Sequence, residues 1–334
     1  MKSLLAYALA VIYGLLMRFF FGFYAGLMQV MSLSLLALVP LAVGFLTVAL
    51  NGINNAKSSW TAFFMPWLTS LLLLLITIAL SMEGAICWIM IYPFFAVMAG
   101  VGGLLGRYYL LEREKRQNRK GESRALDDLD DWNKPGALKI SALLLSPLLL
   151  GLVEGDRLLA PAAYTVERQI TLDAPVSRVW DALASASDIA PLEDPGFLTG
   201  LFGLPRHLRT ALDTLAVGGR RMAYYERGLF FEETITHCQP GAQLVVAIKA
   251  DPDNIPPTVL DEHIAIGGRH FKALEDTYTL HTLPDGRCRL QLSGRISIQT
   301  PFNWYAGLWA QWVLGEVLEG VLEGVAMRVS SFEF

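Results

Sequence analysis

Two carboxylates and one tyrosine are the side chains in this sequence best suited to chemistry. Glu233, Asp276 and Tyr278 lie in segments where apolar and polar residues alternate, as they do in strands with one buried face. A carboxylate that faces an apolar interior has a raised pKa, because burial penalises its charged form. Such a group can act as a general acid or base, for example by removing a proton beside a ketone. These three residues are therefore the candidates for catalysis.

Two histidines lie near these candidates in the chain. His237 is predicted on the same face as Glu233, whereas His263 lies in a long loop and is predicted at the surface. A purely structural role is the competing interpretation: Glu233 or Asp276 would meet an arginine at the rim of the sheet, or the face assignment would be off by one residue. No Ser-His-Asp order, phosphate loop or HExxH motif occurs, which argues against a nucleophilic hydrolase and a nucleotide enzyme.

Composition argues against two further kinds of partner. The three cysteines, Cys87, Cys238 and Cys288, form no CxxC and no metal-ligand spacing, so we expect no metal and no other cofactor. Residues 163–334 hold 14 Lys and Arg against 21 Asp and Glu, a net charge of −7 (14 − 21). An acidic domain of this kind is not expected to bind nucleic acid.

Strand alternation predicts which side chains share an inward face with the candidates. If Phe231 and Ile235 point inward, Glu233 does so too, because the side-chain period of a strand is two. Further inward sets are Leu274, Asp276, Tyr278 and Leu280; Leu290, Leu292, Ile296 and Ile298; and Met222, Tyr224 and Glu226. The predicted ligand-binding residues are Tyr224, Phe231, Glu233, Ile235, Asp276, Tyr278, Leu292 and, from the closing helix, Trp309 and Trp312.

These residues need a sheet and a helix to position them. Strands are predicted at 165–172, 207–217, 219–227, 229–238, 242–249, 271–281 and 287–299, separated by Gly- and Pro-rich turns. Short helices at 177–186 and 188–194 follow the first strand, and a long amphipathic helix at 303–330 closes the chain. This order predicts an α+β domain in which a curved antiparallel sheet wraps round the last helix.

Two loops are placed to control access to that interior. The first, 191–208, is rich in Pro, Gly, Leu and Phe and contains Phe197 and Phe202; the second is 251–270. The first loop either dips into a lipid surface or packs on its own domain as a lid.

Three segments carry a resemblance to a known family. Val166–Trp180 (VERQITLDAPVSRVW), Gly218-Gly219-Arg220-Arg221 and the run from Glu233 to Gly241 (ETIT, three residues, then Pro-Gly) resemble the polyketide cyclase/START superfamily of helix-grip proteins (SRPBCC). The closing YAGLWAQW segment, Tyr305–Trp312, fits the same family. The resemblance covers about residues 163–330 and implies a deep cavity for lipids, polyketides or other hydrophobic molecules. The superfamily has no universal catalytic motif, so no catalytic residue is carried over.

The first third of the chain has the composition of a membrane protein. Residues 1–106 contain only four charged side chains, Lys2, Arg18, Lys57 and Glu83, and charges are costly inside a bilayer. Segments 4–24, 30–50, 60–81 and 85–108 are each long enough to span it, and Leu138–Val153 is a fifth, shorter segment. We therefore expect transmembrane helices in 1–110, a charged loop at 111–137, a fifth helix at 138–155 and the helix-grip domain at 163–334.

Basic residues predict the orientation of these helices. Seven of them, from Arg107 to Arg124, follow the fourth segment and place that loop in the cytoplasm. A spanning fifth helix then puts the last domain outside the bacterial inner membrane, in the periplasm; if that helix only dips in, the domain stays cytoplasmic. Arg18 and Glu83 are predicted at one level, where they either pair or reach the headgroups separately.

Together these features predict a membrane-anchored protein that binds or transfers a hydrophobic, lipid-like molecule. We expect binding rather than catalysis. A polyketide cyclase-type enzyme using Glu233 or Asp276 is one alternative. A non-catalytic sensor or assembly factor, whose helices contact another membrane protein, is the other.

Overall fold

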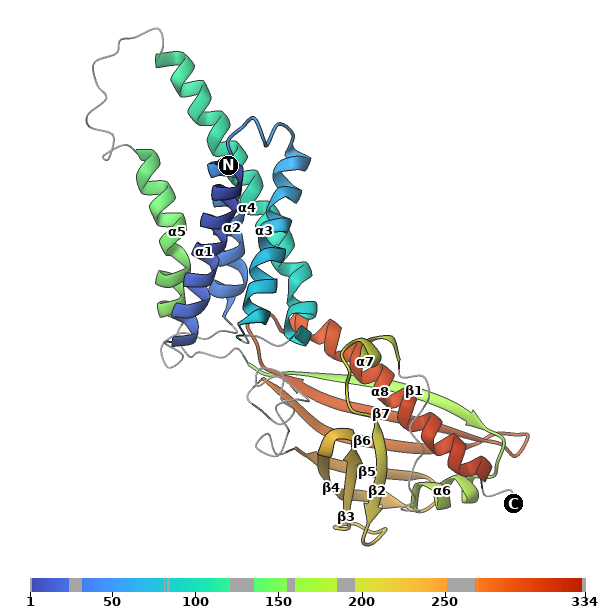
Figure 1. The fold of residues 1–334 in the computed structure, drawn as a ribbon. Helices are drawn as coiled ribbons and strands as arrows, with labels where there is room; N and C mark the ends of the chain where they lie inside the picture. The colour runs from blue at the N-terminus through green and yellow to red at the C-terminus, as the bar shows by residue number, and fades with distance from the viewer. Residues whose placement is uncertain are drawn as a thin grey trace. The chain divides into compact units, whose positions relative to one another are not determined.

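A computed structural model describes residues 2–23, 32–80, 82, 85–120, 135–154, 160–184, 196–250, 268 and 270–331. The chain forms two compact units, Met1–Leu158 and Leu159–Phe334 (Figure 1). The predictions for His263, Glu83 and a helix at 188–194 fall outside the described residues.

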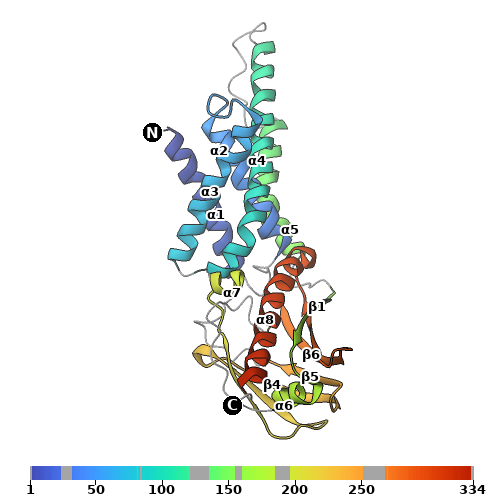
Figure 2. The same ribbon diagram turned by 90° about the vertical axis from the view of Figure 1, so that its right-hand side faces the viewer.

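The first unit is a bundle of apolar helices (Figures 1 and 2). Its helices are α1 (Lys2–Phe23), α2 (Val39–Asn51), which is preceded by the π-helical turn Ser34–Leu38, α3 (Ser59–Ala79), α4 (Ala85–Lys120) and α5 (Pro135–Glu154). Among the described residues, four segments are long and apolar enough to cross a membrane, namely Ser3–Phe23, Ser34–Asn51, Ser59–Ala79 and Ile86–Gln117. The apolar part of α5, Ile140–Glu154, is shorter.

Small residues let α4 pack directly on its neighbours. A Cβ added to Gly102 would overlap the backbone carbonyl of Leu41 on α2, and one added to Gly44 would overlap that of Ala99 on α4. Gly103 lies equally close to the carbonyl of Ala62 on α3. Helices in lipid associate through such close backbone contacts, since lipid tails leave little hydrophobic gain for their association.

Polar side chains tie α5 to this bundle. The Glu154 carboxylate, at the end of α5, accepts hydrogen bonds from the backbone N–H groups of Leu33 (2.8 Å) and Ser34 (3.1 Å) and from the Ser34 hydroxyl (2.7 Å). It thereby caps the N-terminal end of the helical segment that leads into α2. Tyr13 of α1 donates to the carbonyl of Leu144 in α5 at 2.8 Å. Arg18 donates to the carbonyl of Met82 at 3.1 Å.

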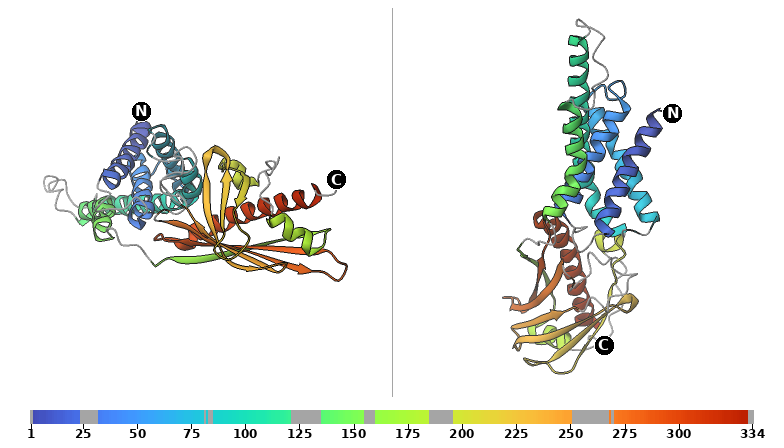
Figure 3. Two further views of the ribbon diagram at one scale, coloured as in Figure 1. Left: turned by 90° about the horizontal axis from the view of Figure 1, so that it is seen from below. Right: turned by 90° about the vertical axis from the view of Figure 1, so that its left-hand side faces the viewer.

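In the part of the second unit that the structure describes, helices accompany one antiparallel sheet (Figure 3). Its strands are β1 (Ala162–Leu172), β2 (His207–Leu212), β3 (Arg220–Tyr225), β4 (Phe230–Gln239), β5 (Gln243–Lys249), β6 (Phe271–Thr282) and β7 (Cys288–Ile298). They are ordered β1-β7-β6-β5-β4-β3-β2, so every neighbouring pair except β1 and β7 is joined by a sequential connection. The helices are α6 (Val176–Ala184), α7 (Phe197–Leu201) and α8 (Asn303–Ser331).

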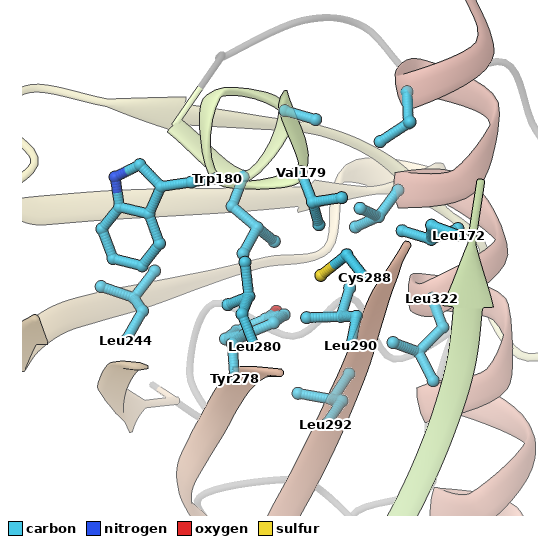
Figure 4. Close-up of a cluster of buried hydrophobic side chains, with 14 of the residues drawn as sticks. Leu172, Val179, Trp180, Leu244, Tyr278, Leu280, Cys288, Leu290, Leu292 and Leu322 are labelled. Carbon is cyan, nitrogen blue, oxygen red and sulfur yellow. The ribbon is translucent and has the colours of Figure 1, made fainter. Parts of the chain in front are cut away.

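The core of this unit lies between the sheet and α8 (Figure 4). Strands β5, β6 and β7 contribute side chains such as Leu244, Leu280 and Leu290, and α8 contributes Leu318, Leu322 and Val325. Trp180 and Val179 of α6 close one end of the same cluster. The curved sheet wrapped on a long C-terminal helix confirms the predicted helix-grip architecture.

Two elements differ from their predictions. The strand predicted at 207–217 ends at Leu212, where Asp213 leaves the ladder and its side chain accepts a hydrogen bond from the Arg220 N–H at 2.8 Å. The loop predicted at 191–208 contains the short helix α7.

Candidate functional site

A buried ion pair links β3 and β4 on the inner face of the sheet. Arg221 and Glu233 lie directly opposite each other in the register of these strands, and their residues are only 6% and 8% exposed. Arg221 Nε is 3.4 Å from Glu233 Oε2, but the two atoms are not aligned for a hydrogen bond. Among the described residues, Arg221 Nε, Arg221 Nη1 and Glu233 Oε2 are buried without a hydrogen-bond partner.

Asp276 and Tyr278 extend this group from β6. The guanidinium carbon of Arg221 lies 5.6 Å from the centre of the Tyr278 ring. Asp276 is partly exposed and lies opposite Gly294 of β7. A Cβ at Gly294 would be 3.1 Å from Asp276 Oδ1 and 3.2 Å from Leu318 of α8, so the missing side chain lets the helix approach the sheet at this carboxylate. We call Arg221, Glu233, Asp276 and Tyr278 the polar cluster.

Tyr225 and His207 flank the polar cluster on β3 and β2. Their rings meet edge to face at 5.1 Å, and His207 Nε2 lies 2.9 Å from the Thr210 hydroxyl. Arg328 of α8 adds a second positive charge that lowers the pKa of His207. The cluster is therefore bordered by aromatic and basic groups.

Burial dominates the protonation of these groups. It raises the pKa of Asp276 to about 7, and the nearby Glu233 charge raises it further against the opposing effect of Arg221. It also raises the pKa of Glu233, while Arg221 opposes that shift. Burial and then Arg328 lower the pKa of His207 to about 4, so this imidazole is neutral at pH 7. Burial alone would lower the pKa of Arg221, but the charges of Glu233, Tyr278 and Asp276 outweigh it.

Most of the predicted inward residues lie where the alternation placed them. Phe231, Glu233 and Ile235 alternate as buried residues along β4, and Asp276, Tyr278 and Leu292 face the same side of the sheet. On α8, the Trp309 ring lies 6.3 Å from that of Phe202, and the Trp312 ring lies 6.4 Å from that of Phe197. Trp312 is 51% exposed, so its ring borders the solvent rather than the core. Ligand contact by these residues remains a prediction.

The face assignment of β3 is wrong by one residue. Arg221 and Ala223 are buried, whereas Tyr224, together with Met222, lies on the other face, where Arg209 stacks over the Tyr224 ring at 4.6 Å. The cause is that Tyr224 and Tyr225 are adjacent and either alternation looks plausible. Glu226 does not belong to the strand but begins a short 3-10 turn.

His237 is also misplaced by the predicted alternation. The ladder between β4 and β5 shifts between Ile235 and His237, which leaves Thr236 as an extra residue. Such a bulge reverses the facing of everything beyond it, so His237 is exposed and Cys238 packs against the core. The charged residue that faces Glu233 is Arg221 on β3, as in the competing interpretation in which this carboxylate meets an arginine.

Arg221, Tyr225, His207 and Arg328 are the site residues that the alternation missed. The signal for Arg221 was the hairpin loop between β3 and β4, the three residues Glu226, Arg227 and Gly228, of which Gly228 has a positive φ of 78°. Counting outward from this three-residue loop pairs Tyr225 with Leu229 and Arg221 with Glu233. No sequence signal places Arg328, since its position depends on the packing angle of α8.

Helix α7 is held on α8 by one carboxylate. Glu316 accepts hydrogen bonds from the backbone N–H groups of Leu198 (3.1 Å) and Thr199 (2.8 Å) and from the Thr199 hydroxyl (3.2 Å). Gly196 allows this approach, because a Cβ there would lie 2.5 Å from Glu316 Oε2. Leu198 and Phe202 are buried beneath the helix. The predicted loop is thus packed on its own domain in this part of the chain.

No protein-family model matches the sequence, and no curated protein matches it significantly. Solved structures with a similar backbone include an uncharacterised protein from Rhizobium leguminosarum (16% identity, 52% of this chain, 97% of that chain, TM-score 0.32). A START superfamily protein from Mycobacterium smegmatis is 13% identical (50% of this chain, 98% of that chain, TM-score 0.33). Norcoclaurine synthase from Thalictrum flavum is 11% identical (53% of this chain, 99% of that chain, TM-score 0.34).

Similarity at this level carries no argument about activity, and the fold assignment rests on the strand order and register. The second unit of this chain has a helix-grip fold, and it follows a bundle of apolar helices.

Proposed function

We propose that this chain is a membrane-anchored protein whose helix-grip domain binds a hydrophobic, lipid-like molecule and holds its polar end at the polar cluster. The observation that carries this proposal is the buried Arg221–Glu233 pair with three unpartnered polar atoms. Buried polar atoms in folded proteins nearly always have a partner, and leaving one unpaired costs about 1–3 kcal/mol. A ligand with hydrogen-bonding oxygens would supply the missing partners.

The surroundings of the cluster favour an amphiphile over a fully polar ligand. Leu244, Val246, Leu280 and Leu292 neighbour it on the sheet, and Leu314 and Leu318 face it from α8. A ligand held here would place a small polar group against Arg221 and apolar chain against leucine and valine. Ligand sites commonly have this form, an apolar lining with a few polar groups that fix orientation.

The apolar helices would attach the binding domain to the membrane in which its ligand is dissolved. A lipid-like ligand is dissolved in the bilayer, and attachment to membrane-spanning helices keeps the domain at a high effective concentration beside it. An assembly factor would have the same anchor but would not require the polar cluster.

The test compares ligand content in matched variants of the full chain. Wild type, the double variant Arg221→Met/Glu233→Leu and the control Arg209→Met are purified in the same detergent and their bound lipids identified by native mass spectrometry. Arg209 is an exposed arginine on the opposite face of the same sheet, so its variant reports lipids held elsewhere. We expect one lipid class to be present in wild type and control and reduced at least tenfold in the double variant.

Equal lipid content in all three proteins would contradict the proposal, because lipids around the helices do not depend on Arg221. The double variant removes both charges together, so it leaves no unpaired buried charge that could unfold the domain.

An enzyme is the second candidate, and one observation favours it. Asp276 is partly exposed and its pKa lies near 7, which suits a general acid or base at neutral pH. Asp276→Asn and Glu233→Gln separate the two functions: a binding protein keeps its ligand in both variants, whereas an enzyme loses turnover in at least one.

A further inference from the structure

The second unit carries an exposed apolar surface on α7 and α8. Trp304, Leu308 and Trp312 follow at four-residue intervals on α8 and are 64%, 62% and 51% exposed, so they form one stripe. Phe197 and Leu201 of α7 are 71% and 52% exposed. The rings of Phe197 and Trp312 stack at 6.4 Å and join the two helices into one surface. We call these five residues the aromatic face; Figures 1 and 2 show α7 beside the first half of α8.

Charged residues are missing from the same stretches of sequence. None occurs from Asn303 to Gly315 or from Gly196 to Pro205, whereas the next turns of α8 carry Glu316, Glu319 and Glu323. The first of these carboxylates is turned toward the backbone of α7. A contiguous apolar surface bordered by polar residues marks an interaction site, since water contact with so many aromatic side chains is unfavourable.

The length of the chain limits what this surface can reach. Residues 155–159 alone separate Glu154, the end of α5, from Ala160, whose carbonyl accepts a hydrogen bond from the Asn303 side chain at the start of α8. An extended chain covers about 3.5 Å per residue, so these two points are at most about 20 Å apart in any arrangement of the two units. The start of α8 therefore stays close to the end of a helix bundle whose long helices are apolar enough to cross a bilayer.

We infer that the aromatic face lies in the headgroup region of the bilayer that holds the apolar helices. Tryptophan is enriched where hydrocarbon meets water, because its ring is apolar and its N–H is polar. Two tryptophans, one phenylalanine and two leucines, in stretches of sequence that contain no Lys or Arg, indicate attachment by apolar burial rather than by attraction to anionic lipid. This inference does not depend on what the domain binds.

The test measures the depth of single spin labels on the full chain in lipid nanodiscs. Cys87, Cys238 and Cys288 are replaced by alanine, and a label is attached at Leu308→Cys, Trp312→Cys or Phe197→Cys. Val217→Cys is the matched control, because Val217 is an apolar residue 66% exposed in the turn between β2 and β3. Labels on the aromatic face are expected to collide readily with oxygen, which dissolves in the bilayer. Their collision rate with a water-soluble nickel complex should be at least fivefold lower than that of the control label.

Two outcomes would overturn the inference. Labels as accessible to nickel as the control would mean that the face lies in water, and labels shielded from both quenchers would mean that protein covers it, either a second copy or another part of this chain.

A second measurement keeps the test valid if the cysteine-free chain does not fold. Native tryptophan fluorescence is recorded in nanodiscs with brominated lipids, in wild type, Trp304→Phe/Trp312→Phe and Trp180→Phe, a buried core position. The double variant should lose a larger share of the quenchable signal than the core variant; equal loss would contradict membrane contact.

Discussion

At the residue scale, the Arg221–Glu233 pair is expected to specify a ligand rather than to stabilise the fold. Removing one partner leaves the other charge buried alone, which costs about 3–5 kcal/mol, whereas replacing both with apolar residues is often neutral. Arg221→Met and Glu233→Leu should therefore each lower the unfolding temperature of the second unit, and the double variant should recover most of the loss. The unfolding temperature is measured on the detergent-solubilised chain, with the protease resistance of the second unit as the signal that reports unfolding. A double variant as unstable as the sum of the singles would mean that the two side chains contribute to stability independently, and it would contradict the coupling expected of a buried pair.

Asp276 and His207 should give this domain opposing dependences on pH. The pKa of Asp276 rises on folding from 3.8 to about 7, so its contribution to stability is full below about pH 4 and is lost as the pH rises to about 7. The pKa of His207 falls on folding from 6.5 to about 4, so its contribution is full above about pH 6.5 and is lost as the pH falls to about 4. The two effects partly cancel in the wild-type protein.

Single variants should reveal each effect. Between pH 4.5 and 7, the unfolding temperature of Asp276→Asn should rise relative to wild type as the pH increases, and that of His207→Gln should fall. Unfolding curves at four pH values in that range measure both slopes. Parallel slopes in all three proteins would show that neither group titrates differently in the folded state.

At the element scale, Glu316 is expected to control the opening of α7. Its carboxylate accepts two backbone N–H groups and one hydroxyl, and hydrogen bonds to a charged group contribute about 1.5–3 kcal/mol. Glu316→Ala should therefore speed amide exchange at Leu198 and Thr199 at least tenfold. Hydrogen-exchange mass spectrometry checks this, with Glu323→Ala as control, since Glu323 is an exposed glutamate two turns further along the same helix. Unchanged exchange would mean that Leu198 and Phe202 hold α7 by burial alone.

Helix α4 should tolerate a larger side chain on its exposed side but not on the side that packs against α2. Gly102→Leu places a side chain against the backbone of α2, where even a Cβ would overlap the Leu41 carbonyl. Val101→Leu, one residue away, adds volume at a position that is already 36% exposed. Overpacking of a close helix contact commonly costs 1–3 kcal/mol or more, so Gly102→Leu should lower the yield of folded protein in detergent and Val101→Leu should not. Size-exclusion profiles of the two variants give the comparison.

The sequence predicts elements with a strict period and misses those that depend on a single shifted residue. Strand β7 and the part of β6 after its bulge at Leu274 alternate regularly, so Tyr278, Leu280, Leu290 and Leu292 lie on the predicted inward face, whereas Leu274 is the extra residue of the bulge. Strand β3 is short and has two adjacent tyrosines, and β4 contains a bulge, so Tyr224 and His237 were assigned to the wrong face. A bulge inserts one extra residue, so every later residue of the strand points to the opposite face of the sheet from the one that the alternation predicts. The buried arginine of the site was missed because the face of β3 was assigned wrongly, while both carboxylates were predicted on the inward face.

At the scale of the whole molecule, Glu154 and Glu316 have a common role, because each binds the N-terminal end of a helix other than its own. Glu154 binds the first N–H groups of the helical segment before α2, and Glu316 binds those of α7. Each joins an element to one distant in sequence, and each helix end is thereby supplied with an acceptor that neighbouring residues do not provide. The first of these contacts also bears on topology, because it places the end of α5 beside the start of the segment 34–51.

The position of Glu154 predicts on which side of the membrane the second unit lies. Arg107, near the other end of this bundle, donates to the carbonyls of Ala56 (3.2 Å) and Lys57 (3.1 Å) in the turn between α2 and α3. Glu154 bonds instead to residues that precede α2, one helix length away. If the basic loop after α4 is cytoplasmic, α5 ends on the outer side. Alkaline phosphatase fused after Phe334 should then be active in a bacterial host, and the same enzyme fused after Gln117 should be inactive. Activity after Gln117 alone would invert the topology, and inactivity of both would mean that α5 does not cross, which would place the polar cluster and any ligand it binds in the cytoplasm.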